Sequence, residues 1–268
     1  LRSGKIIGTG AFSTVHIGRY FGDVVAVKKQ TREEKDLDEY LLRELAVLKN
    51  INHHNLVAYI GAWDEARVRI STTQNVLYIV TEFCQGGDLL QLLLSSTPLS
   101  WGFRLKMAHD IISGVTHLHS HHLIHRDIKS ANVLLDSNWT CKISDFGMAT
   151  GMDQGETSDK KRMTYCGTEP YMAPELLFQE EYGVEADIFS YGMMLLEIMK
   201  RAKIGEDDFG IRPPSKLFHL DEDLTRRQMP TDAPGSLVVM ALQCVSFESV
   251  DRPSSEEISD WILDLMED

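Results

Sequence analysis

Cysteine is scarce in this sequence of 268 residues, which contains Cys84, Cys141, Cys166 and Cys244. No two of them form a CxxC pair, so their spacing predicts neither a disulfide framework nor a zinc cage. A chain of this length buries enough apolar surface to fold without such cross-links. The cysteine pattern therefore favours a reducing, intracellular compartment.

Long apolar runs are missing as well. The most apolar segment, residues 193–199, is short and contains Glu197, whereas a helix needs roughly 20 apolar residues to cross a bilayer. No signal peptide is recognisable, and the sequence begins at Leu1 rather than methionine. We therefore expect a cytoplasmic domain, cut from a longer chain, that makes no membrane contact.

Positive charge is in deficit. The 27 lysines and arginines are outnumbered by 40 aspartates and glutamates, which gives a formal net charge of −13. A broad nucleic-acid surface requires the opposite balance, so we expect no nucleic-acid partner. The acidic balance is explained better by solubility than by a basic partner.

Two regions of different pattern follow one another along the chain. Short runs rich in β-branched residues predict strands at 5–8, 15–20, 24–28, 58–63 and 76–83. Helical periodicity appears once among these strands, at 36–49. It then dominates the rest of the chain, at 103–118, 184–199, 237–245 and 255–266. The sequence therefore predicts an α+β fold with a small β-rich lobe (residues 1–82) and a larger helical lobe (residues 83–268).

A glycine-rich stretch, IGTGAFSTV, lies between the first two predicted strands and includes Ile7, Gly8 and Gly10. Glycine allows backbone N–H groups to approach phosphates closely. A dinucleotide fold would need a helix after the glycines, but a strand follows here. The Walker pattern GxxxxGK[ST] is absent. Alone, the stretch is as compatible with a plain glycine hairpin as with a phosphate loop.

The strand VVAVK places Lys28 on the same face as Ala26. In the predicted helix 36–49, Glu44 falls in an apolar stripe with Leu41 and Leu48. A carboxylate in such a stripe needs a cation. Lys28 is either an edge lysine in solvent or the partner of Glu44. A Lys28–Glu44 pair that positions nucleotide phosphates explains both placements.

The segments HRDIKSAN (residues 125–132) and DFG (residues 145–147) contain the residue types that phosphoryl transfer needs. The reaction requires the phosphate, metal-bridged charges and the acceptor hydroxyl to be placed in line. Asp127 can accept the hydroxyl proton, and Lys129 can neutralise charge on the moving phosphoryl group. Asn132 and Asp145 can supply oxygen ligands to Mg²⁺.

Glycine loop, VAVK, helix glutamate, HRDxKxxN, DFG and APE (residues 173–175) occur here in the order of the eukaryotic protein kinases. The sequence resembles that family over essentially its whole length, although Ser13 replaces the third loop glycine. The resemblance implies a bilobal kinase fold and an ATP cofactor with Mg²⁺, or Mn²⁺. It also implies protein substrates and an activator, either an upstream kinase or a second copy acting in trans.

The resemblance also implies an ATP site. In it, Thr81 resembles the gatekeeper behind the adenine, and Glu82 to Cys84 resemble the hinge whose backbone pairs with the base. The residues assigned to the nucleotide in this way are Ile7, Gly8, Gly10, Val15, Ala26, Lys28, Thr81, Glu82, Cys84, Leu134 and Asp145.

The same resemblance implies buried charged residues that hold loops in place. Asp187 resembles the carboxylate that holds the catalytic-loop backbone. Glu175 and Arg252 resemble an ion pair that ties the APE helix to the rest of its lobe.

Five of the ten histidines lie in HLHSHHLIH, residues 117–125. His117 and His121 have the i, i+4 spacing of two zinc ligands on one helix face. The kinase resemblance favours a different interpretation, in which His125 packs beneath Phe146 of DFG. We expect the histidines from His117 to His122 to lie at a helix end, in solvent.

Lys129 and Thr168 resemble the pattern of serine/threonine kinases. HRDIKSANVLL and the hinge TEFC are similar to the tyrosine-kinase-like group. EDDFGIR, residues 206–212, is similar to a segment of LIM-domain and testis-specific kinases, which carry asparagine in place of Lys129. We expect transfer to serine and threonine hydroxyls, with a dual-specificity kinase as the alternative.

Two further alternatives concern activity itself. A pseudokinase scaffold is disfavoured because Lys28, Glu44, Asp127, Asn132 and Asp145 are all present. A small-molecule phosphotransferase is disfavoured by GTEPYMAPE, which resembles the peptide-docking floor of protein kinases.

Arg126 precedes the proposed catalytic aspartate and resembles the arginine that pairs with a phosphate on the activation segment. Such a phosphate carries about −1.5 to −2 charges and can order a loop. The sequence offers four acceptors for it, at Thr157, Ser158, Thr164 and Tyr165. We therefore expect phosphorylation of this segment to activate the enzyme.

Overall fold

The computed structural model describes residues 2–9, 13–32, 45–64, 75–151 and 168–267. Its first part is a five-stranded antiparallel sheet with the strand order β1-β2-β3-β5-β4. The strands are β1 (Arg2–Thr9), β2 (Ser13–Tyr20), β3 (Asp23–Arg32), β4 (Tyr59–Asp64) and β5 (Asn75–Glu82). All five predicted strands are present, each extended or trimmed by a few residues.

The register of this sheet brings predicted site residues together. Lys28 lies opposite Val15 on β2, and Ala26 lies opposite Thr81 on β5. Side chains two residues apart on a strand share a face, so Ala26 and Lys28 point the same way with their cross-strand partners. The sheet therefore presents these four side chains on one surface.

The helix predicted at 36–49 is only partly within the described residues. Residues 45–50 are helical, and Leu45 and Leu48 are buried against the core. Glu44 lies outside the described residues, so its predicted pairing with Lys28 stays a prediction.

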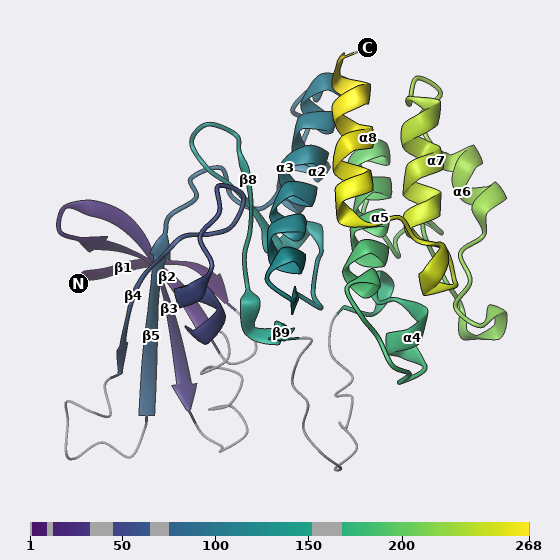
Figure 1. The fold of residues 1–268 in the computed structure, drawn as a ribbon. Coiled ribbons are helices and arrows are strands. Elements are labelled where there is room, and N and C mark those ends of the chain that lie inside the picture. Colours follow the sequence, from purple (N-terminus) through teal and green to yellow (C-terminus); the bar gives the residue numbers. More distant parts are fainter. Residues whose placement is uncertain (1, 10–12, 33–44, 65–74, 152–167, 268) are drawn as a thin grey trace.

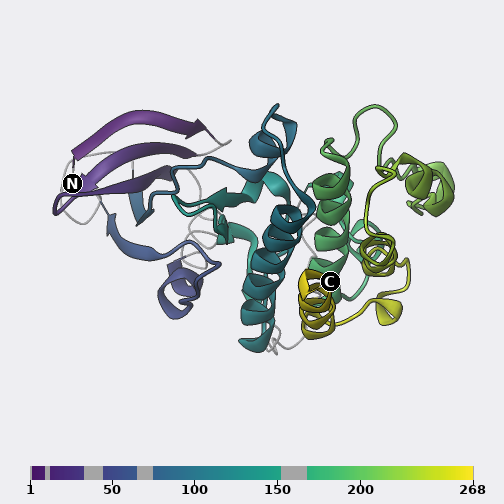
Figure 2. The ribbon, with the colours of Figure 1, turned by 90° about the horizontal axis from the view of Figure 1, so that it is seen from above.

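The rest of the chain is mainly helical. Its helices are α2 (Leu89–Leu94), α3 (Trp101–Ser120), α4 (Pro174–Leu177), α5 (Glu185–Lys200), α6 (Glu222–Gln228), α7 (Gly235–Cys244) and α8 (Ser255–Glu267). The sheet lies at one end of the molecule and this helical part at the other, as Figures 1 and 2 show from two directions. The α+β fold with a β-rich first part is confirmed, whereas the lobe boundary at residues 82 and 83 stays a prediction.

Short strands and 3₁₀ turns lie around the HRD and DFG motifs and between the helices. The strands β6 (Leu123–Ile124) and β9 (Thr150–Gly151) pair, as do β7 (Val133–Leu135) and β8 (Cys141–Ile143). The 3₁₀ turns are η2 (Ser130–Asn132), η3 (Phe146–Met148), η4 (Glu169–Tyr171), η5 (Pro214–Lys216) and η6 (Ser249–Asp251).

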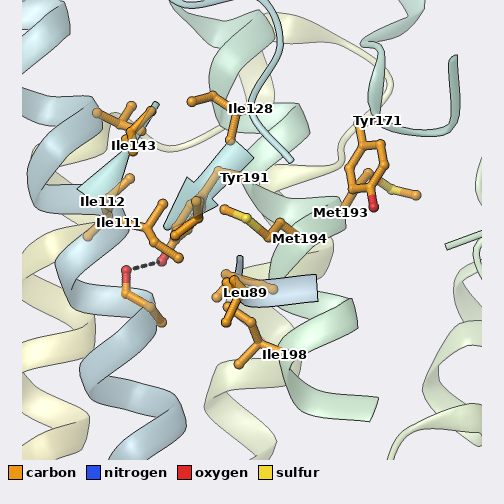
Figure 3. Packing of buried hydrophobic residues seen from close by; sticks show 14 of the residues in the cluster. Leu89, Ile111, Ile112, Ile128, Ile143, Tyr171, Tyr191, Met193, Met194 and Ile198 are labelled. Carbon is orange, nitrogen blue, oxygen red and sulfur yellow. Dashed lines mark hydrogen bonds between the residues drawn. The ribbon is translucent and has the colours of Figure 1, made fainter. Parts of the chain in front are cut away.

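Helix α5 forms the centre of the helical core. Every residue from Ala186 to Met199 is buried, as its nearly uninterrupted apolar sequence predicts. Tyr191 is fully buried and its hydroxyl donates to the Ala108 carbonyl on α3 at 3.0 Å. Figure 3 shows Tyr191 packed with Met194 of the same helix and with Ile111 and Ile112 of α3. This core provides a rigid base for the loops above it.

No helix in the described ranges combines the length and the apolar character needed to cross a membrane.

Candidate active site

A cavity of about 540 Å³ lies where the sheet faces the helical part. Ten of the eleven residues predicted to contact nucleotide line it: Ile7, Gly8, Val15, Ala26, Lys28, Thr81, Glu82, Cys84, Leu134 and Asp145. Gly10, the eleventh, lies outside the described residues. Val15, Ala26 and Leu134 approach the space from different elements, which gives it apolar walls.

The cavity also has polar lining that the sequence interpretation left out. Asp88 caps the N-terminus of α2. Its carboxylate accepts a hydrogen bond from the backbone N–H of Gln91 at 2.8 Å and another from the side-chain amide of Gln91 at 2.6 Å. Both residues line the cavity. The N-cap type of Asp88 is the signal that could have located the start of a helix here.

The hinge carboxylate of Glu82 is already engaged. It accepts from the Ala58 N–H at 2.8 Å and pairs with Lys142 Nζ at 3.0 Å. Lys142 also donates to the His54 carbonyl at 2.9 Å. The Glu82 side chain is therefore held against Ala58 and Lys142.

Lys28 and Asp145 form an ion pair in the lining of the cavity. Lys28 Nζ donates to Asp145 Oδ1 at 2.9 Å, and half of the Asp145 side chain is exposed. Burial raises the pKa of Asp145, but Lys28, His125 and Lys129 outweigh it, so the pKa lies below its ordinary value. Asp145 has a left-handed backbone with φ of 63°, which turns it out of the preceding strand. The carboxylate is therefore ionised and reachable from the cavity.

A second cluster surrounds Asp127. Lys129 Nζ donates to Asp127 Oδ2 at 2.7 Å and to Thr168 Oγ1 at 2.6 Å. The Thr168 hydroxyl donates to Asp127 Oδ1 at 3.0 Å. Asn132 Nδ2 donates to Asp127 Oδ2 at 2.8 Å and to its carbonyl at 2.9 Å. Side chains from the catalytic loop and from the GTEPYMAPE segment therefore hold one carboxylate in place.

Asn132 and Asp145 fit the requirements of a hard cation. Both line the cavity. The amide nitrogen of Asn132 is used by Asp127, while its amide oxygen accepts no hydrogen bond from any described residue. An amide oxygen and an ionised carboxylate facing one space are the donor types that Mg²⁺ prefers. The residues therefore suit the metal that the sequence predicted.

Comparison with known proteins agrees with this geometry. The protein kinase domain family matches residues 1–263. The chain belongs to the protein kinase family. Its relatives in Dictyostelium discoideum include a probable serine/threonine-protein kinase, 36% identical over 93% of this chain and 57% of the relative. Another is the probable serine/threonine-protein kinase kinX, 38% identical over 94% of this chain and 22% of the relative.

A third relative is the RasGEF domain-containing serine/threonine-protein kinase X, 36% identical over 94% of this chain and 25% of the relative. The kinase domain thus spans between 22% and 57% of the length of these relatives. Protein kinases use ATP with Mg²⁺ and act on proteins, and several relatives are named as serine/threonine kinases. The tyrosine-kinase-like grouping and the LIM-domain resemblance stay predictions.

Asp187 anchors the catalytic loop of the kinase domain, as expected. Its carboxylate accepts from the backbone N–H groups of His125 and Arg126, both at 2.8 Å. Burial raises its pKa, but a hydrogen bond from His119 and further contacts bring the pKa below its ordinary value. The buried ion pair is present too, since Arg252 donates to both Glu175 oxygens, at 2.6 and 2.8 Å.

The prediction that His117 to His122 lie in solvent is wrong for two of them. His119 is 7% exposed and its Nε2 lies 3.1 Å from Asp187 Oδ2. His117 stacks on His53, with ring centroids 4.7 Å apart, and lies 4.4 Å from His121. The helix end was predicted correctly, since α3 ends at Ser120, but the tertiary fold gives His119 a carboxylate and His117 a second ring as partners.

His125 packs against Phe146 as predicted, with ring centroids 5.3 Å apart in an edge-on arrangement. Its Nε2 donates to the Ser144 carbonyl at 3.1 Å, which leaves Nδ1 to accept from the Asp127 N–H at 3.3 Å. The described residues contain no group of three or more metal-ligating side chains. The role of His125 is therefore to connect the HRD and DFG turns.

Glu197 is a functional neighbour that the sequence interpretation missed. It is fully buried, and burial raises its pKa. It accepts from the hydroxyls of Ser130 at 2.6 Å and Tyr171 at 2.7 Å, and from the Ile204 N–H at 2.9 Å. Glu197 therefore ties the catalytic loop, the GTEPYMAPE segment and the loop after α5 to one point. The available signal was the one acid within the apolar run of residues 193–199.

Proposed function

We propose that this domain transfers the γ-phosphate of ATP to serine and threonine hydroxyls of protein substrates. The observation that carries the proposal is the triangle of Asp127, Lys129 and Thr168, whose three contacts lie between 2.6 and 3.0 Å. It joins a proton acceptor and a cation to the segment that resembles the peptide-docking floor. A scaffold would have no need to hold these groups together.

In this proposal Asp127 orients the acceptor hydroxyl and takes its proton. The donors around the carboxylate hold it at a fixed angle and cost no reorganisation during the reaction. Lys129 is placed to neutralise negative charge that develops between the nucleotide and the acceptor. Because both groups are fixed by Thr168, substrate docking and catalysis are geometrically linked.

The nucleotide is held in the cavity. Lys28, with Glu44 as its proposed partner, positions the phosphates, while main-chain atoms of Glu82 to Cys84 contact the base. Asn132 and Asp145 would hold Mg²⁺, which when bound neutralises phosphate charge and orients the transferred group. The apolar walls of the cavity enclose the base and exclude water from its faces.

Regulation is proposed to act through Arg126. This arginine is 8% exposed, and it donates from Nε to the Met148 carbonyl and from Nη1 to the Tyr182 hydroxyl at 2.9 Å. It therefore already connects the HRD turn to the start of the activation segment. The four candidate phosphorylation sites, Thr157, Ser158, Thr164 and Tyr165, lie outside the described residues. We propose that a phosphate on one of them, added by an upstream kinase or a second copy in the cytoplasm, completes this connection.

The proposal is tested by autophosphorylation with ATP and Mg²⁺, read by mass spectrometry, for wild type and Asp127→Asn. Loss of the proton acceptor is expected to reduce transfer by about 10²–10⁴-fold, while nucleotide binding is retained. Phosphothreonine or phosphoserine between residues 157 and 168 supports the serine/threonine assignment, and phosphotyrosine at Tyr165 would indicate dual specificity. Bound nucleotide without transfer to itself or to a panel of protein substrates would favour the scaffold.

A further inference from the structure

Arg212 is a buried cation that the proposed chemistry does not use. It ends the EDDFGIR segment after α5 and is 9% exposed. Its Nη2 donates to three backbone carbonyls, those of Glu169 at 3.3 Å, Pro170 at 3.2 Å and Met172 at 2.5 Å. One guanidinium therefore gathers three carbonyls of the GTEPYMAPE segment.

The remaining carbonyl of this stretch is also held. Tyr171 O accepts from the Ser190 hydroxyl of α5 at 2.9 Å. All four carbonyls from residue 169 to residue 172 thus have side-chain donors from other parts of the chain. The carbonyls of Tyr171 and Met172 are buried and need such partners. The four bonds together restrain the shape of the segment.

The held stretch begins next to the catalytic groups. Thr168 immediately precedes it and contacts both Lys129 at 2.6 Å and Asp127 at 3.0 Å. A shift of the backbone at Glu169 would carry Thr168 with it. The position of the Thr168 hydroxyl therefore depends on what fixes the carbonyls behind it.

Arginine suits this place because of its flat guanidinium group. Its Cζ lies 4.5 Å from the ring centroid of Phe189, and Arg252 lies 5.0 Å from the same ring. A lysine would keep the charge but lose this stacking surface. Burial, followed by the charge of Arg252, lowers the pKa of Arg212 to about 10, which leaves it protonated at neutral pH.

The backbone below Arg212 is itself firmly held. Phe209 is fully buried, and its carbonyl accepts from the Gly205 N–H at 2.8 Å. Gly210 has a φ of 65°, and a Cβ there would lie 2.6 Å from Ile204 Cδ1. Arg212 therefore extends from a fixed base toward a segment that depends on it.

We propose that Arg212 is a positioning residue that holds residues 168–172 in the shape that receives the polypeptide substrate. The proposal rests on the proposed protein kinase function. It assigns Arg212 no contact with ATP, since the described lining of the cavity excludes it. Its loss should therefore weaken use of the peptide and leave use of the nucleotide unchanged.

The test compares steady-state kinetics of wild type, Arg212→Met and Arg212→Lys with a peptide identified from the autophosphorylation sites. For Arg212→Met we expect the peptide KM to rise about tenfold with the ATP KM within about twofold of wild type. The peptide KM of Arg212→Lys should fall between those of wild type and Arg212→Met, because lysine keeps the charge but cannot stack on the ring. A merely structural role would lower kcat through loss of active protein and would leave the peptide KM unchanged.

Arg104 offers a matched control. It stacks on Trp101 at 4.4 Å and donates to the carbonyls of Leu99 at 3.2 Å and Met199 at 2.7 Å, away from the docking segment. Arg104→Met removes an equivalent arginine and should alter stability without changing the peptide KM. Equal effects of the two methionine variants on the peptide KM would overturn the proposal. Should Arg212→Met fail to fold, an unchanged peptide KM in Arg212→Lys would also overturn it.

Amide hydrogen exchange separates this proposal from the function on which it rests. Residues 168–177 should exchange faster in Arg212→Met than in wild type, and not in Arg104→Met, whether or not phosphate is transferred. If wild type binds nucleotide but phosphorylates nothing, the proposed function is refuted. Amide hydrogen exchange of residues 168–177 would still test whether Arg212 positions this segment. Unchanged exchange in this segment would refute the positioning role, whatever the activity.

Discussion

At the scale of single residues, the site depends on charges that are matched before any substrate arrives. Lys28 faces Asp145, and Lys129 faces Asp127, with N–O distances of 2.9 and 2.7 Å. Each pair places a cation beside a carboxylate in a partly enclosed space, where an unpaired charge would be costly. The pair of Lys28 and Asp145 therefore lies in the lining of the cavity, and the pair of Lys129 and Asp127 lies next to it, in contact with Asn132 of that lining.

Lys28→Met is expected to shift the acid limit of metal–nucleotide binding to higher pH. Burial alone raises the pKa of Asp145, and Lys28 is the foremost of the groups that lower it. A carboxylate with a lowered pKa is ionised until the pH falls through that value, so removing Lys28 makes the ionised form disappear at a higher pH. The measurement is Mg²⁺-nucleotide affinity between pH 4 and 8 for each variant.

Lys29→Met serves as the control, because Lys29 alternates to the opposite face of β3 and does not line the cavity. Lys29→Met should show the wild-type dependence of Mg²⁺-nucleotide affinity on pH. An unchanged acid limit in Lys28→Met would show that Lys28 does not govern the ionisation of Asp145.

At the scale of elements, helix α5 connects the core to the site. It buries apolar side chains on every face and also carries Asp187, Ser190 and Glu197, which bind the catalytic loop and the docking segment. Polar groups buried on such a helix are stable only with hydrogen-bond partners. The helix therefore requires the loops in their places as much as the loops require the helix.

Gly192→Ala is expected to disturb the contact between α5 and α7. A Cβ at this position would lie 2.6 Å from Cys244 Cβ and 2.7 Å from Val245 Cγ1. Overpacking of this kind costs about 1–3 kcal/mol, which exceeds the ~1 kcal/mol that alanine gains over glycine within a helix. The variant should unfold at lower denaturant concentration than wild type.

Gly102 on α3 provides the comparison, since a Cβ there meets nothing within 4 Å. Gly102→Ala should match or exceed wild-type stability because only the helix preference changes. If both alanine variants shift the denaturant midpoint equally, close packing at Gly192 is not the cause.

At the scale of the whole molecule, histidine rings join the loop before β4 to helix α3. His53 stacks on His117, and the pKa of each lies below its ordinary value. Burial is the first cause for both, followed by His117, His54 and Lys142 for His53 and by His121 for His117. This contact therefore holds neutral rings together.

The free energy of unfolding is expected to fall as the pH drops below about 6.5. In this range the two histidines become protonated in the unfolded chain, whereas in the folded chain His53 and His117 bind protons only at lower pH. A lowered histidine pKa in the folded state means that the unfolded state carries more protons, so stability rises with pH through this window. Replacing both rings in His53→Phe/His117→Phe should flatten the dependence of the unfolding temperature on pH between 5 and 7. The control variant His122→Asn, at an exposed histidine, should leave the dependence of the unfolding temperature on pH unchanged. A double variant with the full wild-type slope would contradict the assignment.

Several features of the fold and site could be predicted from the sequence. The strands and the central helix were predictable because strand alternation and helical periodicity depend on neighbours along the chain. The residues that line the cavity were predicted from the resemblance to the protein kinases. The residue types at Asp127, Asn132 and Asp145 predicted a phosphate and metal site because so few side chains supply that chemistry. Asn132 and Asp145 line one cavity, and Asn132 donates to Asp127 at 2.8 Å.

The sequence by itself determined which chemistry the chain can perform, since the groups that bind metal, move protons and carry charge are inherent in its residues. Only the tertiary structure decided how His119, Glu197 and Arg212 are used. Each meets partners tens of residues away in the chain, and no local pattern encodes such a meeting. Their roles follow from packing, because a buried polar group is stable only where the fold brings a hydrogen-bond partner to it.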